Sequence, residues 1–150
     1  MRSIPDPGFA GDDGAVAPEV AAALAAYDAE PGSRDRASAV LAALRTSRLL
    51  VPVLAVADEV EYDDQGLARE KTSDMAALLM RGRDGRTALL AFTASDSLRS
   101  WNSEARPVPV AAGQAALAAV QEGAAALLVD VAGPVKFVVQ GEDLAALAGP

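Results

Sequence analysis

Two short apolar runs separated by an Asp-Gly pair constrain the fold more than any other feature of the sequence. The runs occupy residues 75–80 and 88–92, and residues 82–85 between them read Gly-Arg-Asp-Gly. Asp-Gly readily supplies the positive φ angles that a tight hairpin turn needs. The pattern therefore predicts a central β-hairpin with both of its faces largely covered.

A short helix is predicted directly after this hairpin. Ser95 is expected to be its N-cap, and Leu98 and Trp101 are three residues apart, so that they share one helical face. We expect that face to fold back onto the hairpin. Trp101 should then be mostly buried, because the chain has few other aromatic side chains to fill its core.

The remaining elements follow from apolar spacing and from proline, glycine and capping residues. Helices are expected after Pro18 (residues 19–28), after the N-cap Ser33, over residues 111–121 and near the C-terminus. Strands are expected over residues 49–56, 106–110, 126–129 and 135–139. These elements predict an α+β fold, in which helices pack against a mixed or antiparallel sheet of about five or six strands.

Three details of these elements can be checked against a structure. On the helix over residues 111–121, Leu117 and Val120 are expected to face inward. Pro52 should place its strand at an edge or a bulge, because proline cannot donate to a sheet ladder. Arg45 and Arg48 are expected at the end of a helix, where the helix dipole favours cations; anion binding is the alternative for this pair.

The length of 150 residues fits one domain. We expect residues 1–17, which are rich in proline, glycine and aspartate, to form an extended N-terminal arm, and residues 18–150 to form a single α+β domain. A hairpin followed by a short helix is predicted twice, over residues 75–101 and 125–148. The two units share an architecture without an obvious sequence identity.

Composition excludes several classes of function. The chain carries a net charge of −8 and has neither cysteine nor histidine. The acidic balance disfavours nucleic-acid binding. Without cysteine and histidine, thiolate catalysis, cysteine-based zinc sites and imidazole bases are impossible. We therefore expect no enzymatic activity, no metal site and no cofactor.

Membrane association is not expected either. No apolar run approaches the ~20 residues needed to span a bilayer, and the N-terminal residues lack the apolar core of a signal peptide. The sequence therefore predicts a cytoplasmic protein.

Several blocks of sequence occur in an order that is typical of one family. They include RLLVPVLAV, GLAREKTSDMA, ARPVPV and AGPVKFVV, and together they cover nearly the whole chain. In these blocks the chain resembles the SseB N-terminal-domain-like family, in the form seen in actinobacteria. The resemblance implies a small α+β domain, and it supplies no established catalytic residues to carry over.

Two polar segments are candidate sites. Residues 58–64 hold five acidic side chains and, with Glu70, resemble a calcium loop, but Asp64 stands where that loop needs glycine. A solvated loop is the favoured interpretation. In the next segment Glu70, Lys71 and Asp74 could line a cleft, and Lys71 could activate Ser73 only in a suitable geometry. The alternative is a purely structural role, in which Lys71 makes an ion pair and Ser73 or Asp74 ends the loop.

Trp101 and Arg106 complete the set of candidate ligand-binding residues, since an exposed tryptophan near arginines would indicate a binding surface. The spacing of Leu98 and Trp101 favours core packing instead. Two hypotheses for function remain. The first is a non-catalytic protein-interaction module, binding an unknown protein or a second copy of itself through the proline-marked edges at residues 49–56 and 106–110. The alternative is a small-molecule-binding protein or weak enzyme, with a cleft near Lys71, Asp74 and Trp101.

Overall fold

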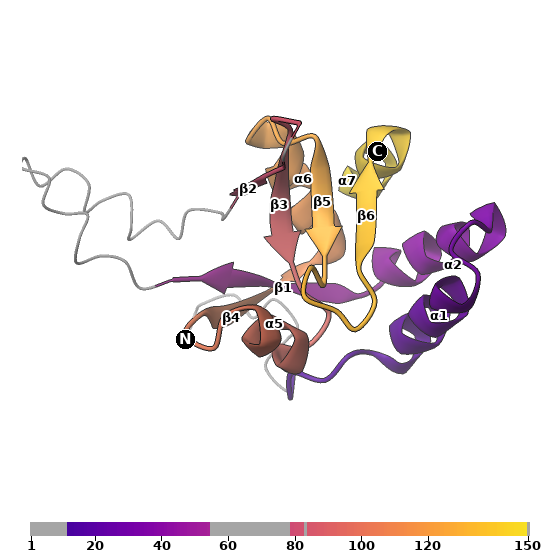
Figure 1. The fold of residues 1–150 in the computed structure, drawn as a ribbon, viewed down its shortest axis with the longest axis horizontal. Coiled ribbons are helices and arrows are strands. Elements are labelled where there is room, and N and C mark those ends of the chain that lie inside the picture. Colours follow the sequence, from indigo (N-terminus) through magenta and orange to yellow (C-terminus); the bar gives the residue numbers. More distant parts are fainter. Residues whose placement is uncertain (1–11, 55–78, 83, 150) are drawn as a thin grey trace, which may run out of the picture.

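Six strands and five helices make up the parts of the chain that the structure, a computed structural model, describes: residues 12–54, 79–82 and 84–149 (Figure 1). The helices are α1 (Pro18–Ala29), α2 (Arg34–Arg45), α5 (Ser95–Trp101), α6 (Ala112–Gln121) and α7 (Gly141–Ala148). The strands are β1 (Arg48–Val53), β2 (Leu79–Arg81), β3 (Thr87–Ala91), β4 (Arg106–Ala111), β5 (Ala126–Val129) and β6 (Phe137–Gln140). The predicted α+β class is confirmed, with the strands divided between two sheets.

The larger sheet has the strand order β2-β3-β5-β6. The pair β3–β5 is parallel and the other two pairs are antiparallel, so the sheet is mixed. The β2–β3 hairpin is the one that the apolar runs predict, and Gly85 in its turn adopts a positive φ of 87°. It is not central, however, because β2 is the edge strand and its Leu79 is 41% exposed. Residues 75–78 of the first apolar run lie outside the described residues.

One face of this sheet is covered by helices. Figure 1 shows α6 and α7 behind the sheet and α1 and α2 on the side of β6. Pro18 is the first residue of α1, and Ser33 accepts a hydrogen bond from the N–H of Arg36 (3.2 Å), so both predicted helix starts are confirmed. Tyr27 of α1 meets Phe137 of β6 edge to face, with ring centroids 5.0 Å apart. The main core lies between these helices and the sheet.

The smaller sheet pairs β1 with β4 in antiparallel register. A second apolar cluster joins it to the end of β3 and to α5, and includes Leu50, Phe92 and the fully buried Leu98. Trp101 shares the predicted face with Leu98, and its ring centroid lies 5.6 Å from that of Phe92. Its side chain is only half-buried, however, and not mostly buried as predicted. Ser95 is the first residue of α5 and not its cap, because Ala94 holds the N-cap position. The N–H of Ser95 donates to the carbonyl of Gly14 (2.8 Å).

The prolines of the smaller sheet fall where they remove no ladder hydrogen bond. Leu50 exchanges two backbone hydrogen bonds with Phe92 (2.7 and 2.8 Å), so its backbone groups point away from β4. Pro109 stands opposite Leu50, and Pro107 stands opposite Pro52 two residues along. In antiparallel pairing, residues at these positions turn their backbone nitrogens outward. The two segments that the first hypothesis assigned to partner binding thus pair with each other, and the outer edge of β4 lacks two N–H donors for strand addition.

Arg48 was expected at the end of a helix, but it is the first residue of β1, where it holds the N-terminal segment. Its guanidinium donates to the Asp12 carboxylate and to the carbonyls of Ala15 and Thr93. The hydrogen bond from Arg48 lowers the pKa of Asp12 below its ordinary value. Arg48 is therefore occupied by these internal partners, and the arginine pair offers no joint anion site.

Helix α6 buries a face different from the predicted one. Its buried residues are all alanines: Ala112, Ala115, Ala116 and Ala119. Leu117 and Val120, predicted to face inward, are 42% and 48% exposed. The small face lets α6 lie close to α7, where a Cβ on Gly113 would meet the carbonyl oxygen of Leu147 at 3.0 Å. The close backbone approach that small side chains allow decides the orientation of this helix, and its larger side chains stay outside the core.

This orientation of α6 predicts that a substitution on its alanine face costs more stability than one at its exposed Leu117. Ala116→Leu should lower the free energy of unfolding by about 1–3 kcal/mol, because the larger side chain overpacks a fully buried position. Leu117→Ala should change it by no more than about 0.5 kcal/mol, since little buried contact is lost. Urea unfolding of the two variants measures both effects. The reverse order would show that α6 presents its larger side chains to the core after all.

None of the helices in the described part of the chain has both the length and the apolar character that a membrane crossing requires.

Candidate functional site

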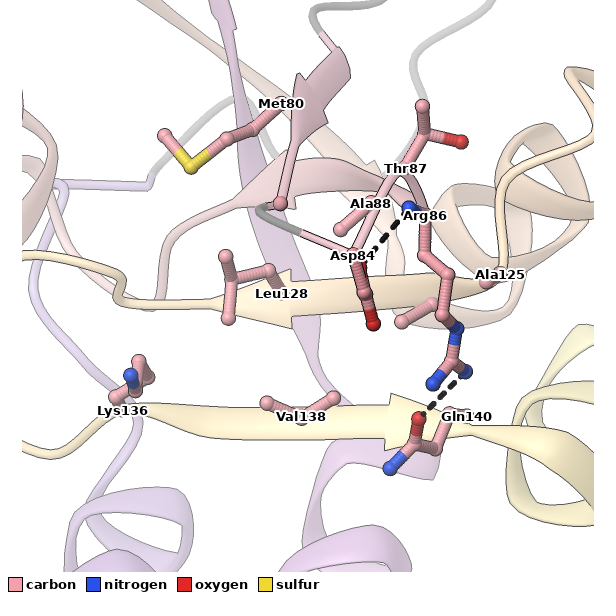
Figure 2. A pocket seen from close by; sticks show the side chains of 12 residues that line it. Met80, Asp84, Arg86, Thr87, Ala88, Ala125, Leu128, Lys136, Val138 and Gln140 are labelled. Carbon is pink, nitrogen blue, oxygen red and sulfur yellow. Dashed lines mark hydrogen bonds between the residues drawn. The ribbon is translucent and has the colours of Figure 1, made fainter.

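The second face of the four-stranded sheet carries a groove beside the second apolar cluster, which buries Leu90 of the same face. The part of this face that the cluster leaves uncovered is called here the open face. Side chains alternate between the two faces of a strand. Leu89 and Leu127 therefore enter the helix-covered core, while their neighbours Ala88 and Leu128 point to the open face. The apolar floor of the groove consists of Met80, Ala88, Ala126, Leu128 and Val138 (Figure 2).

The register of the strands gives this floor its shape. Ala88 lies beside Ala126, with Met80 on one side of this pair and Gln140 on the other. The next row along the strands has Leu128 beside Val138. The two small alanine side chains leave a hollow between larger neighbours, and the groove has a volume of about 600 Å³.

Polar and charged side chains stand on the rim of the groove. Arg86 donates from Nη2 to Oε1 of Gln140 (3.1 Å), and Asp84 accepts the backbone N–H of Arg86 at Oδ1 (3.0 Å). Figure 2 shows Lys136 and Gln140 at the two ends of β6, with Val138 between them. Among the described residues, the rim therefore carries two cations and one carboxylate, in a chain whose net charge is −8.

Among the described residues, the lining of the groove includes one hydroxyl group, that of Thr87, and the chain contains no histidine or cysteine. In residues 12–54, 79–82 and 84–149, no three acidic side chains come together as a metal site would need.

Residues 20–146 match the model of the SseB protein N-terminal domain family. The chain belongs to the SseB N-terminal domain family. The resemblance that the sequence blocks indicate is thereby confirmed. No curated protein and no solved structure shows a significant match to the chain. The matched range contains every residue that lines the groove, so the groove is part of the SseB domain itself.

Two of the five predicted site residues, Trp101 and Arg106, lie in the described part of this SseB domain. Glu70, Lys71 and Asp74 lie outside the described residues, as does the acidic stretch at residues 58–64. Trp101 packs against Phe92, and Arg106 is exposed at the start of β4. Neither Trp101 nor Arg106 lines the groove.

Sequence analysis missed the groove residues of the SseB domain. Arg86, Lys136 and Val138 are not among the candidate residues that the sequence predicts. A signal was available in the alternation at residues 136–140, where Lys136, Val138 and Gln140 share one face and two apolar residues lie between them. An exposed valine between polar residues of the same face marks a side of the strand that the helices do not cover.

A buried carboxylate at the end of β5 serves the fold and not the groove. Asp130 accepts hydrogen bonds from the N–H of Thr93 (2.8 Å), the hydroxyl of Thr93 (2.7 Å) and the hydroxyl of Ser97 (2.8 Å). Burial raises the pKa of Asp130 above its ordinary value, although these three hydrogen bonds oppose the rise. Because all three donors are protein groups, Asp130 ties the ends of β3 and β5 to α5.

Proposed function

We propose that this SseB domain is a non-catalytic protein-interaction module that binds its partner through the open face of the four-stranded sheet. The observation that carries the proposal is the apolar groove, with Val138 41% exposed in its floor. Helices cover the opposite face of the same strands. An apolar sheet face is stable when another layer packs against it, and a partner can supply that layer.

The sheet edges are the weaker candidates for binding. On the outer edge of β4, Pro107 and Pro109 remove the N–H donors that an added strand would need. Side-chain packing on the open face does not require such donors. The proposal therefore keeps the interaction role that the sequence suggests and moves it from the strand edges to the sheet face.

Charge placed in the groove floor tests this proposal. Val138→Glu should reduce the recovery of specific partners at least about tenfold in affinity capture from native lysate, because it puts a carboxylate into an apolar contact. Leu117→Glu is the matched control, since Leu117 is equally exposed (42%) but lies on α6. Thermal unfolding should show that both variants fold. Capture that is equal for wild type and Val138→Glu would contradict the proposal.

A small-molecule-binding protein is the alternative, and the volume of the groove is the observation in its favour. About 600 Å³ lies within the range of ligand pockets. This alternative places the ligand in the groove and not near Trp101, where the sequence analysis expected a cleft. Recovery of a small molecule, and of no protein, with the purified wild-type domain would favour it.

A further inference from the structure

We propose that the groove binds an amphipathic helix of a partner protein, whose apolar stripe is flanked by carboxylates about two helical turns apart. This inference rests on the proposed function and names the chemistry of the partner. The residues that carry it are the alanine pair in the floor and the two cations of the rim, Arg86 and Lys136.

The width of the open face suits a helix. Four strands about 4.8 Å apart span ~14 Å, and a helix with its side chains is ~10–12 Å across. Ala88 and Ala126 lie side by side in the middle of the sheet, so a helix can approach closely there. Met80 and Val138, from the two outer strands, would contact its flanks. On the opposite face of the same sheet, α6 already packs by close approach of small side chains.

Backbone hydrogen bonding favours a helix over an extended peptide. An extended segment laid on the open face would leave its own N–H and C=O groups without partners in an apolar contact. The groups of the sheet itself are already paired within its ladders. A helix satisfies its backbone internally and offers only side chains to the floor.

The positions of Lys136 and Arg86 determine how far apart the carboxylates of the partner helix should be. Lys136 and Gln140 are four residues apart along one strand, which corresponds to ~13 Å. The hydrogen bond to Gln140 holds the guanidinium of Arg86 at the far end (Figure 2). Two carboxylates seven or eight residues apart on a helix are separated by ~10–12 Å, so both cations can be reached at once. Asp84, the one acidic side chain among the described residues of the rim, lies at the hairpin turn and accepts a backbone N–H there.

Two synthetic peptides test the chemistry directly. Both are fluorescein-labelled helices of about 18 residues with the same leucine stripe. One carries two glutamates seven residues apart along one side of the stripe, and the other carries lysines in their place. In anisotropy titrations with the full chain, the acidic peptide should bind about tenfold more tightly, and added salt should reduce the difference.

Charge-reversal variants locate the effect. Arg86→Glu combined with Lys136→Glu should reverse the preference between the two peptides. Arg34→Glu should leave it unchanged, since Arg34 is exposed in the first turn of α2, away from the groove. Val138→Glu should weaken the binding of both peptides. Equal binding of the two peptides, or a preference that survives the double variant, would overturn the inference.

Further outcomes separate this inference from the proposed function. If neither peptide binds while Val138→Glu still abolishes partner capture, the helix is the wrong occupant and the interaction face stands. If light scattering shows a dimer that Val138→Glu dissociates, the occupant is a second copy of the chain and the inference fails. If Val138→Glu changes neither peptide binding nor capture, the inference and the proposed function fail together.

Discussion

Replacing Phe92 with alanine is expected to lower the free energy of unfolding by about 3–5 kcal/mol, among the largest losses for any single side chain of this protein. Phe92 is fully buried and its ring packs against Trp101. Its backbone also exchanges two hydrogen bonds with Leu50, which makes Phe92 the joint between the two sheets. Truncation removes the side chain that fills this joint and leaves a cavity at it.

Urea unfolding of the wild type and of Phe92→Ala measures the loss. Phe92→Leu is the matched control, since it keeps most of the apolar volume and should lose no more than about 1.5 kcal/mol. The fluorescence of Trp101, the only tryptophan, gives a second measurement. Its emission should move to longer wavelength in Phe92→Ala as the half-buried indole gains contact with water. A loss below about 1 kcal/mol would mean that the two sheets are joined by contacts other than Phe92.

Local signals in the sequence predicted those parts of the fold that local chemistry decides. The Asp-Gly turn fixed the β2–β3 hairpin because Gly85 needs a positive φ. Pro18 and Ser33 marked the starts of α1 and α2, since proline fits a first helical position and serine accepts an unpaired N–H. Each of these interactions lies within a few residues of chain.

Long-range packing decides the features that were missed. In α6 apolar residues lie on most sides of the helix, so the pattern alone did not reveal that the alanine face would be buried. The pairing of β1 with β4 joins segments more than fifty residues apart, and two prolines in β4 made that segment look like an isolated extended stretch. The groove draws residues from the β2–β3 turn, β5 and β6, and becomes visible only when their register is known.

The buried Asp130 should also be sensitive to truncation. Asp130→Ala is expected to lower the free energy of unfolding by about 3–5 kcal/mol, because it leaves the N–H and the hydroxyl of Thr93 without their acceptor, while the hydroxyl of Ser97 keeps the carbonyl of Ala94 (2.9 Å). The backbone adds to this loss: Asp130 has a positive φ of 54°, a conformation that aspartate and asparagine tolerate better than alanine.

Asp130→Asn is the informative control for the charge of this group. The amide oxygen of asparagine can accept from the N–H of Thr93 and the hydroxyl of Ser97, while its NH₂ donates to the hydroxyl oxygen of Thr93. The N–H of Thr93 and the hydroxyl of Ser97 keep their acceptor, and the shape and the tolerance for positive φ are kept. At acidic pH the stability of this variant should therefore lie within about 1 kcal/mol of the wild type.

The two variants should respond differently to pH. Burial raises the pKa of folded Asp130 above 3.8, so the folded state holds its proton more tightly than the unfolded chain does. The stability that this group contributes is then complete below its unfolded pKa and is lost as the pH rises through the folded pKa. Wild type should therefore lose stability relative to Asp130→Asn as the pH rises from about 4 toward neutrality, while Asp130→Ala stays the least stable throughout. Urea unfolding of the three proteins across this range measures the differences. If the stability of the wild type instead rises relative to that of Asp130→Asn with increasing pH, the three hydrogen bonds lower the pKa of Asp130 by more than burial raises it.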